Sequence, residues 1–382
     1  MSGYPVISWH EAGEEKSVRW RSENGSPPPR RVLIADDRMT ADTAYRQACE
    51  GNALLWRGDF QNARQLLQAI ARRVDKKPRD RKKKKIACMP VEAFHLHRQA
   101  QSQRTRILGM LLLPFDADHS IPLRRAPDVR SACIDAYGAG TEPYIASLRG
   151  LQGLIGAYEW RKKGVEIPAL GVRIHPHYGV FSPIRSEYVR LVVNAPLPKL
   201  TMAQPVAFDI GTGTGVLAAV LAGRGIKRII ATDRDLRALD CARENLTQLG
   251  FIEQVDLVQT DLFPEGQAAL IVCNPPWIPA RPSSPLEHAI FDPESRMLKG
   301  FLNGLAAHLA PGGEGWLILS DLAEHLELRT RAELLAAIDA AGLKVLSKAD
   351  IKPYHPRVSD TSDSLHTARA AELTSLWQLT AK

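Results

Sequence analysis

The stretch Ala269-Leu270-Ile271-Val272-Cys273-Asn274-Pro275-Pro276-Trp277 joins an apolar run to a rigid polar ending. The apolar residues predict a buried strand, and the two prolines then stop that strand. Proline fixes φ and disfavours the helical conformation in the residue before it, so the turn holds Asn274 and the Pro275 carbonyl in one shape. Trp277 adds a flat aromatic surface beside these two acceptors. The alternative interpretation is an ordinary exit from a strand, with a tryptophan in the core.

Two hydrogen-bond acceptors beside a flat ring suit the methylation of an sp² nitrogen. Such a nitrogen is a weak nucleophile, because its lone pair is delocalised into a ring or a carbonyl group. A methylating enzyme has to hold the N–H protons and keep the lone pair in line with the methyl group. Asn274 and the Pro275 carbonyl can accept those hydrogen bonds, and Trp277 can face a planar substrate. The predicted catalytic residues are therefore Asn274, Pro275, Pro276 and Trp277.

A glycine-rich segment upstream predicts a site for a nucleotide-like ligand. The sequence Val206-Ala207-Phe208-Asp209-Ile210-Gly211-Thr212-Gly213-Thr214-Gly215 is typical of a strand followed by a glycine loop, and an apolar run then predicts a helix. The glycines permit the tight turn and let the backbone approach a ligand. Asp233 ends the next apolar run, where a carboxylate would accept hydrogen bonds from both hydroxyls of a ribose. The same geometry serves NAD, but the asparagine–proline turn favours methyl transfer.

On these two motifs, residues 170–382 resemble the class I S-adenosylmethionine-dependent methyltransferases, in the branch with an N-P-P-aromatic motif. That branch includes adenine-N6 and guanine-N2 nucleic-acid methyltransferases and the release-factor glutamine methyltransferases. The resemblance implies a doubly wound, seven-stranded α/β sheet of the Rossmann type, with S-adenosyl-L-methionine bound past the carboxyl ends of the strands. The remaining pattern fits this alternation, with helices expected over 236–249, 294–309 and 330–341, strands over 254–259 and 315–320, and a final antiparallel pair over 343–348 and 373–379.

The resemblance also implies which residues hold the cofactor. By matching motif positions, the expected set is Asp209, Gly211, Thr212, Gly213, Gly215, Asp233, Asp261 and Asn274. The aspartate and glycines of the first motif would hold the methionine part, Asp233 the ribose and Asp261 the adenine amine. A carboxylate that caps a helix or turn is the alternative for Asp261, because aspartate is common at strand ends.

A second match precedes the first strand. The segment Gly179-Val180-Phe181-Ser182-Pro183-Ile184-Arg185-Ser186-Glu187 looks like the one before the first strand in the glutamine methyltransferases. It departs from their pattern, since Ile184 stands where a second arginine–proline step is expected. This match therefore does not decide the substrate.

The composition of the 382 residues sets the class of protein. With 45% hydrophobic and 24% charged residues, the chain is typical of a soluble globular protein that can bury two cores. Its five cysteines are scattered without C-x-x-C spacing, which predicts reduced thiols in a cytoplasmic protein and no disulfide or zinc site. His95 and His97 would point to different faces of a helix, so we expect no metal. The longest apolar run, from Ile107 to Phe115, is too short to span a membrane.

Three segments are expected along the chain. Residues 1–30 are polar and proline-rich without a helical or strand period, which predicts a flexible arm with Trp9 and Trp20 as its anchors. Residues 31–160 carry apolar residues at helical spacing and predict a mostly helical domain for substrate recognition. Residues 170–382 form the expected methyltransferase domain. Within that domain, the polar excursion over 351–367 is expected to be a lid or to be disordered.

A basic run lies inside the predicted helical domain. Residues 72–85 contain ten lysines or arginines against two aspartates, a local charge of +8 that equals the net charge of the whole chain. Such a block repels itself and predicts an arm that binds phosphates, with a solvated linker or a nuclear address as alternatives. The expected nucleic-acid-binding residues are Arg79, Arg81, Lys82, Lys83, Lys84 and Lys85.

Three hypotheses for function follow from the sequence. The favoured one is N-methylation of a nucleic-acid base, with RNA preferred, in which Trp277 stacks on the base and the basic run binds phosphates. The second is the same reaction on a glutamine side chain of a protein in the translation apparatus. The third is a non-catalytic RNA-binding protein that keeps the fold, and the intact motif residues argue against it.

Overall fold

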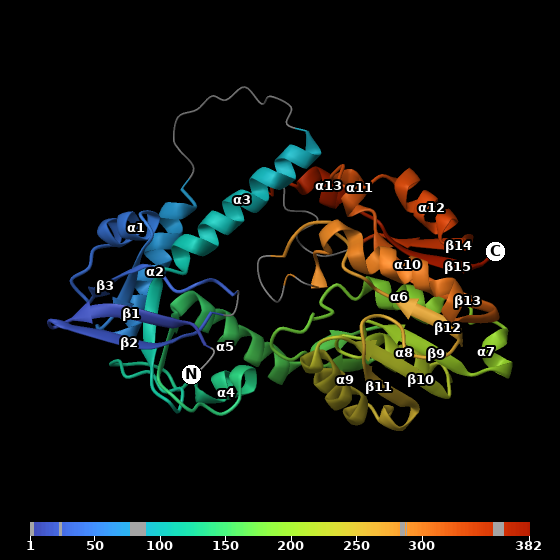
Figure 1. Ribbon diagram of the computed structural model, residues 1–382, viewed down its shortest axis with the longest axis horizontal. Helices are drawn as coiled ribbons and strands as arrows, with labels where there is room; N and C mark the ends of the chain where they lie inside the picture. The colour runs from blue at the N-terminus through green and yellow to red at the C-terminus, as the bar shows by residue number, and fades with distance from the viewer. Residues whose placement is uncertain (1–3, 23–24, 77–88, 283–286, 288, 354–362) are drawn as a thin grey trace. The chain divides into compact units, whose positions relative to one another are not determined.

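The computed structural model describes the chain except for residues 1–3, 23–24, 77–88, 283–286, 288 and 354–362. The described chain divides into two compact units (Figure 1). The first, here called the N-terminal unit, comprises Met1–Cys88 and His95–Glu159. The second, the C-terminal unit, comprises Met89–Phe94 and Trp160–Lys382.

The N-terminal unit is built around a six-stranded sheet with the order β1-β2-β6-β5-β4-β3. Its strands are β1 (Val6–Glu11), β2 (Glu14–Trp20), β3 (Arg31–Ala35), β4 (Asn52–Trp56), β5 (Leu111–Phe115) and β6 (Tyr144–Ser147). The neighbours β3, β4 and β5 are parallel, whereas β1 and β2 form an antiparallel hairpin. Its helices are α1 (Ala41–Cys49), α2 (Phe60–Val74) and α4 (Arg130–Tyr137), together with most of α3 (Pro90–Leu108) and most of α5 (Leu148–Lys163).

Helical residues outnumber strand residues among the described residues of these elements, in line with the expected mostly helical domain. The central sheet, however, was not predicted. β4 has four consecutive buried residues, because a parallel strand covered on both faces shows no polar–apolar alternation. Its short apolar run lies close to those of the flanking helices, so the spacing alone predicts a helical segment.

The expectation of a flexible arm over residues 1–30 is wrong for β1 and β2. Trp9 and Trp20 are buried in one apolar cluster with Ile7, Leu55 and Ile145, so they anchor the hairpin to the sheet. The short polar strands conceal this role, since most residues of β2 are exposed. The six expected nucleic-acid-binding residues between Arg79 and Lys85 lie outside the described residues.

The C-terminal unit contains a seven-stranded sheet with the order β11-β10-β9-β12-β13-β15-β14. Its strands are β9 (Val206–Ile210), β10 (Arg228–Asp233), β11 (Val255–Gln259), β12 (Ala268–Cys273), β13 (Leu309–Ser320), β14 (Leu343–Ile351) and β15 (Thr374–Ala381). The first five strands in this order are parallel, and β15 is antiparallel to both β13 and β14. The predicted doubly wound, seven-stranded sheet is therefore confirmed. A separate two-stranded sheet pairs β7 (Val165–Ile167) with β8 (Val172–Ile174).

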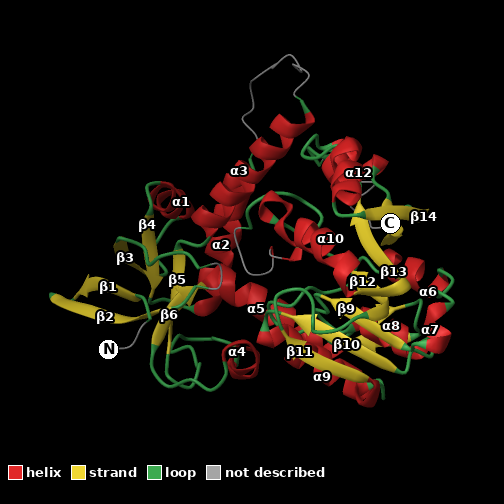
Figure 2. Ribbon diagram, turned by 45° about the vertical axis from the view of Figure 1, so that its right-hand side comes forward, coloured by secondary structure: helices red, strands yellow, loops and turns green. Residues whose placement is uncertain are grey.

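Helices cover both faces of this sheet (Figure 2). They are α6 (Glu187–Asn194), α7 (Leu200–Ala203), α8 (Val216–Gly223), α9 (Leu236–Gln248), α10 (Arg296–His308), α11 (Leu322–His325), α12 (Arg331–Ala340) and α13 (His366–Ala371). Successive side chains of β12 enter opposite cores, with Leu270 and Val272 packing beside α8 and Ile271 and Cys273 beside α10. The strand is therefore apolar at every position, as the opening stretch of sequence predicted.

Two general features bear on the type of protein. No helix in the described part of the chain is long and apolar enough to cross a bilayer. Among the described residues, the histidine, cysteine, aspartate and glutamate side chains form no group of three or more that would hold a metal ion.

Candidate active site

The two sequence motifs meet where the direction of winding changes in the sheet. From β9 the chain proceeds to β10 on one side, and β12 lies on the other side, which makes the carboxyl end of β9 the topological switch point. Cys273 at the end of β12 pairs with Ile210 at the end of β9. The glycine loop (residues 211–215) and the Asn-Pro-Pro-Trp turn (residues 274–277) therefore leave the sheet side by side.

The glycine loop adopts a backbone that side chains would disturb. Gly211 has φ of +73°, and a Cβ there would lie 2.6 Å from Cε of Met297. Gly215 has φ of +80° where α8 begins, and its Cβ would lie 3.2 Å from the Cα of Ala242. Both positions are in the left-handed region that favours glycine. The glycine at position 215 thus lets α8 and α9 lie close together.

Asp209, in β9, accepts hydrogen bonds from the glycine loop and from α8. Its Oδ2 accepts hydrogen bonds from Thr212 Oγ1 at 2.7 Å and from the backbone N–H of Ala218 at 3.1 Å. Its Oδ1 is buried and has no partner. Burial raises the pKa of Asp209 to about 6, against the lowering effect of these hydrogen bonds. A buried carboxylate with one unpaired oxygen fits a cationic group, such as the ammonium group of the methionine part of the cofactor.

Asp233 lies at the end of β10, as predicted. Its Oδ2 accepts from the N–H of Gly213 at 3.1 Å, and its Oδ1 accepts from the N–H of Asp235 at 3.0 Å. Burial raises the pKa of Asp233, and these backbone hydrogen bonds oppose the effect. Each carboxylate oxygen keeps a further lone pair, so the residue fits the expected contact with two ribose hydroxyls.

Asp261 has a partner that the sequence did not predict. It follows β11 and forms an ion pair with Arg296, the first residue of α10. Both side chains are more than half exposed, so a ligand can reach Asp261 and replace Arg296 as its partner. The amine of a bound adenine would compete with Arg296 for this carboxylate.

The Asn-Pro-Pro-Trp turn is closed by its own tryptophan. Trp277 Nε1 donates to Asn274 Oδ1 at 2.9 Å. The ring is half-buried and packs against three apolar clusters of the unit, and Cζ of Arg185 lies 5.3 Å from its centroid. Part of the ring is therefore covered by neighbouring side chains, and its stacking on a flat substrate stays a prediction. The indole also orients the asparagine.

Arg185, Glu187, Ser320 and Glu372 form a polar cluster beside this turn that sequence reasoning did not assign to the site. Arg185 lies in the segment over residues 179–187 that precedes the first strand, but its partner Glu372 is 187 residues away. No local signal in the sequence connects these two positions. The cluster therefore emerges only from the fold.

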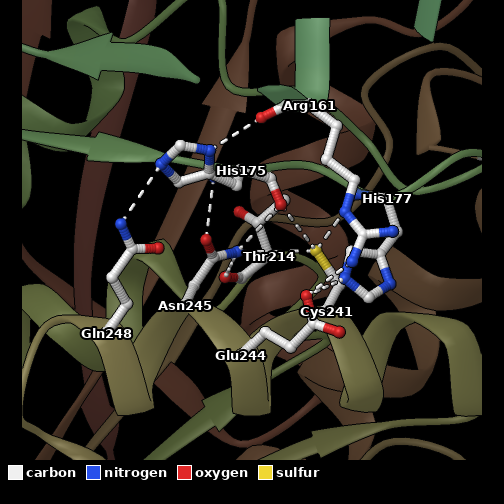
Figure 3. Close-up of polar contacts among 8 residues, drawn as sticks. All are labelled: Arg161, His175, His177, Thr214, Cys241, Glu244, Asn245 and Gln248. Carbon is white, nitrogen blue, oxygen red and sulfur yellow. Dashed lines mark hydrogen bonds and ion pairs between the residues drawn. The ribbon is translucent and has the colours of Figure 1, made fainter. Parts of the chain in front are cut away.

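A second network of polar contacts includes Thr214 of the glycine loop (Figure 3). The N–H of His175 donates to Asn245 Oδ1 at 2.8 Å, and Asn245 Nδ2 donates to the carbonyl of Thr214 at 3.1 Å. The segment after β8 is thereby joined to α9 and to the loop. The other residues in this network are Arg161, His177, Cys241, Glu244 and Gln248. His175 and His177 are thus half-buried structural residues, and neither lies in the Asn-Pro-Pro-Trp turn.

Comparisons with known proteins agree with this geometry. Residues 171–330 match the family model described as methyltransferase small domain. The release factor glutamine methyltransferase of Cereibacter sphaeroides is 37% identical over 153 residues, which cover 38% of this chain and 51% of that protein. The ribosomal protein L11 methyltransferase of Clostridium perfringens is 34% identical over 90 residues, covering 23% of this chain and 28% of that protein.

Among solved structures, the ribosomal protein L11 methylase of Lactobacillus delbrueckii subsp. bulgaricus is similar. It has 21% identity and a TM-score of 0.37, and the match covers 56% of this chain and 86% of that chain. The chain spans about half or less of the length of the two curated relatives named here. The matched region contains both the glycine loop and the Asn-Pro-Pro-Trp turn. Over residues 171–330, the chain is therefore similar to methyltransferases with a small methyltransferase domain.

Proposed function

We propose that this chain transfers a methyl group from S-adenosylmethionine to a planar amide nitrogen in a protein of the translation apparatus. The observation that carries the proposal is the fixed acceptor in the turn, where the indole N–H of Trp277 donates to Asn274 Oδ1. Because this contact identifies the oxygen and orients it, the asparagine is ready to accept an N–H proton. Such a preorganised polar contact suits a reaction in which an N–H group must be held in position.

The chain's own residues would position the substrate and hold the cofactor. The second lone pair of Asn274 Oδ1 and the carbonyl of Pro275 would each accept one substrate N–H, which aims the nitrogen lone pair. Asp209, Asp233 and Asp261 would hold the methionine, ribose and adenine parts of the cofactor. Bound S-adenosylmethionine supplies a methyl group already activated by its positively charged sulfur, so no strong base is required. Orientation then contributes most of the rate, up to about 7–11 kcal/mol.

A protein amide is preferred over a nucleic-acid base for two reasons. Arg185 and three apolar clusters surround the ring of Trp277, which leaves less aromatic surface for stacking than a base would use. The two named relatives are a release factor glutamine methyltransferase and a ribosomal protein L11 methyltransferase. Translation proteins work in the cytoplasm, so we propose the same location for this chain.

An RNA base is the second candidate, and the basic run favours it. Ten cations among residues 72–85 are suited to phosphates. Arg72 and Arg73 lie in the last turn of α2, whereas residues 77–88 are outside the described part of the chain. A domain that binds ribosomal RNA would also bring a protein substrate of the ribosome within reach, so the run is compatible with both candidates.

An experiment with labelled cofactor distinguishes the protein substrate from the RNA substrate. The protein is incubated with methyl-labelled S-adenosylmethionine and cell extract, and the product is divided between nuclease and protease digestion. We expect the label to survive nuclease and to appear on an amide side chain after protease digestion. Label that is released by ribonuclease would support the RNA candidate. If the parent protein and Asn274→Ala label the extract equally, the proposed reaction is wrong for both substrates.

A further inference from the structure

Arg185 is held between two buried carboxylates from distant parts of the C-terminal unit. Its Nη2 and Nη1 donate to Oε1 and Oε2 of Glu372 at 3.0 and 3.4 Å, and its Nε donates to Glu187 Oε1 at 3.0 Å. Glu372 and Glu187 are only 1% and 2% exposed. Burial lowers the pKa of Arg185, but the two carboxylates outweigh this effect and the pKa is raised. The fork of the guanidinium therefore has one well-defined orientation.

Glu372 is itself fixed to the end of β13. Ser320 Oγ donates to Glu372 Oε1 at 2.6 Å, and the N–H of Leu322 donates to Ser320 Oγ at 3.0 Å. Next to Glu372, the backbone of Leu373 exchanges hydrogen bonds with Asp321, at 2.7 Å to its Oδ1 and 3.0 Å from its N–H. The segment before β15 is thus attached to the residues that follow β13.

These contacts reach the Asn-Pro-Pro-Trp turn through the indole. Cζ of Arg185 lies 5.3 Å from the centroid of the Trp277 ring, which is within the range of a cation–π contact. The indole N–H in turn donates to Asn274 Oδ1. One continuous series of contacts therefore connects Glu372 with Arg185, Trp277 and Asn274.

We infer that Arg185 and Glu372 form a clamp that positions Asn274 through the indole of Trp277. Neither residue touches the substrate nitrogen in this scheme, so both are positioning residues. Glu372 lies outside residues 171–330, which match the methyltransferase model, and the segment before β15 thus adds a part of the site that the matched domain lacks. The effect of the clamp on turnover rests on the proposed function, whereas its effect on the placement of Trp277 does not.

Glu372→Gln is the variant that tests the clamp without exposing a lone buried charge. The parent cluster contains the carboxylates of Glu187 and Glu372 and the guanidinium of Arg185. In the variant, the carboxylate of Glu187 remains and still pairs with Arg185, so no buried charge is left without a partner. The amide oxygen can still accept from Ser320, so we expect the fold to persist. The guanidinium loses its two-point attachment and shifts over the indole. Asp256→Asn is the matched control, since it removes one carboxylate from the exposed Arg228–Asp256 pair of the same sheet.

The readout is fluorine NMR of the full chain labelled with 5-fluorotryptophan. The chain has seven tryptophans, and the Trp277 signal is the one absent from Trp277→Phe. We expect Glu372→Gln to move or broaden this signal far more than the other signals, and Asp256→Asn to leave all of them in place. For methyl transfer, we expect kcat to fall about two- to tenfold at unchanged KM for the cofactor, since small misplacements at a reacting group are costly.

Each outcome decides one point. If the Trp277 signal of Glu372→Gln coincides with that of the parent, the clamp is wrong, whatever the activity. If the signal moves but kcat is unchanged, the contact exists and the positioning role of the clamp is wrong. If the signal moves and the parent protein methylates nothing, the proposed function fails and the clamp remains as a property of the fold.

Discussion

Replacing Asp209 by asparagine should change how the stability of the apoprotein depends on pH. Burial raises the pKa of this carboxyl from 3.8 to about 6, so the native state binds this proton more tightly than the unfolded state does. Its stabilising contribution is complete below pH 3.8 and is lost as the pH rises through about 6. The difference between a pKa of 3.8 and one of about 6 corresponds to about 3 kcal/mol of unfolding free energy at neutral pH. Asparagine cannot ionise and avoids this loss.

The measurable quantity is the difference in unfolding free energy between variant and parent. In Asp209→Asn, the amide oxygen can still accept from Thr212 and Ala218, but the amide nitrogen takes the position that has no partner. That unsatisfied donor costs about 1–3 kcal/mol, independently of pH. We therefore expect the unfolding free energy of the variant, relative to the parent, to rise by about 2 kcal/mol between about pH 4.5 and about pH 7.5.

Urea unfolding at a series of pH values measures this difference. A difference that stays constant over the range would refute the argument, because it would mean that Asp209 is ionised in the folded protein at every pH tested. Saturating S-adenosylmethionine provides a second comparison. If Asp209 faces the ammonium group of the cofactor, that cation lowers the pKa of the carboxyl, and the pH-dependent part of the difference should shrink.

The remaining predictions concern the cofactor, the turn and the basic run. Asp233→Ala should weaken binding of S-adenosylmethionine by about 1–3 kcal/mol, and calorimetry that finds unchanged affinity would contradict the ribose assignment. Asn274→Ala should lower turnover about a hundredfold or more while the affinity for the cofactor hardly changes; a variant that works at the parent rate would exclude the mechanism. Trp277→Phe keeps an aromatic ring but removes the indole N–H, so kcat should fall about two- to tenfold, and a kcat equal to that of the parent would show that Asn274 needs no such support. Deleting residues 76–85 should leave cofactor binding intact and reduce the slope of log K for RNA against log salt by roughly 0.7 for each phosphate that the run neutralises in the parent, whereas unchanged RNA binding at every salt concentration would make the run a linker.

The sequence predicted the C-terminal sheet well, for a physical reason. Parallel strands that are covered on both faces appear as short apolar runs between turns, and β12 is such a run. The predicted helix over 236–249 corresponds to α9 (Leu236–Gln248). The expected final antiparallel pair is confirmed by β14 and β15. Residues 354–362 of the expected polar excursion lie outside the described part of the chain.

The errors have a common cause, since each depends on contacts between residues far apart in the sequence. The hairpin of β1 and β2 has little apolar character of its own, and it is ordered through Trp9 and Trp20 in a core built largely by later strands. The stacking of Trp277 on a substrate stays a prediction that follows from its residue type alone. Its actual surroundings include Arg185, whose orientation is set by Glu372. Spacing within a motif does not reveal such partners.

The position of β15 between β13 and β14 implies an order of events when the chain folds. Neither neighbour can complete its ladder until residues 374–381 have been synthesised, whereas all strands around the glycine loop emerge earlier. During that interval the long apolar edge of β13, which includes Trp316 and Leu317, is open to pairing with other chains. Glu372 lies two residues before β15, so the contact between Glu372 and Arg185 forms in the same late step. A nascent chain would thus acquire its cofactor site first and the final placement of Asn274 last.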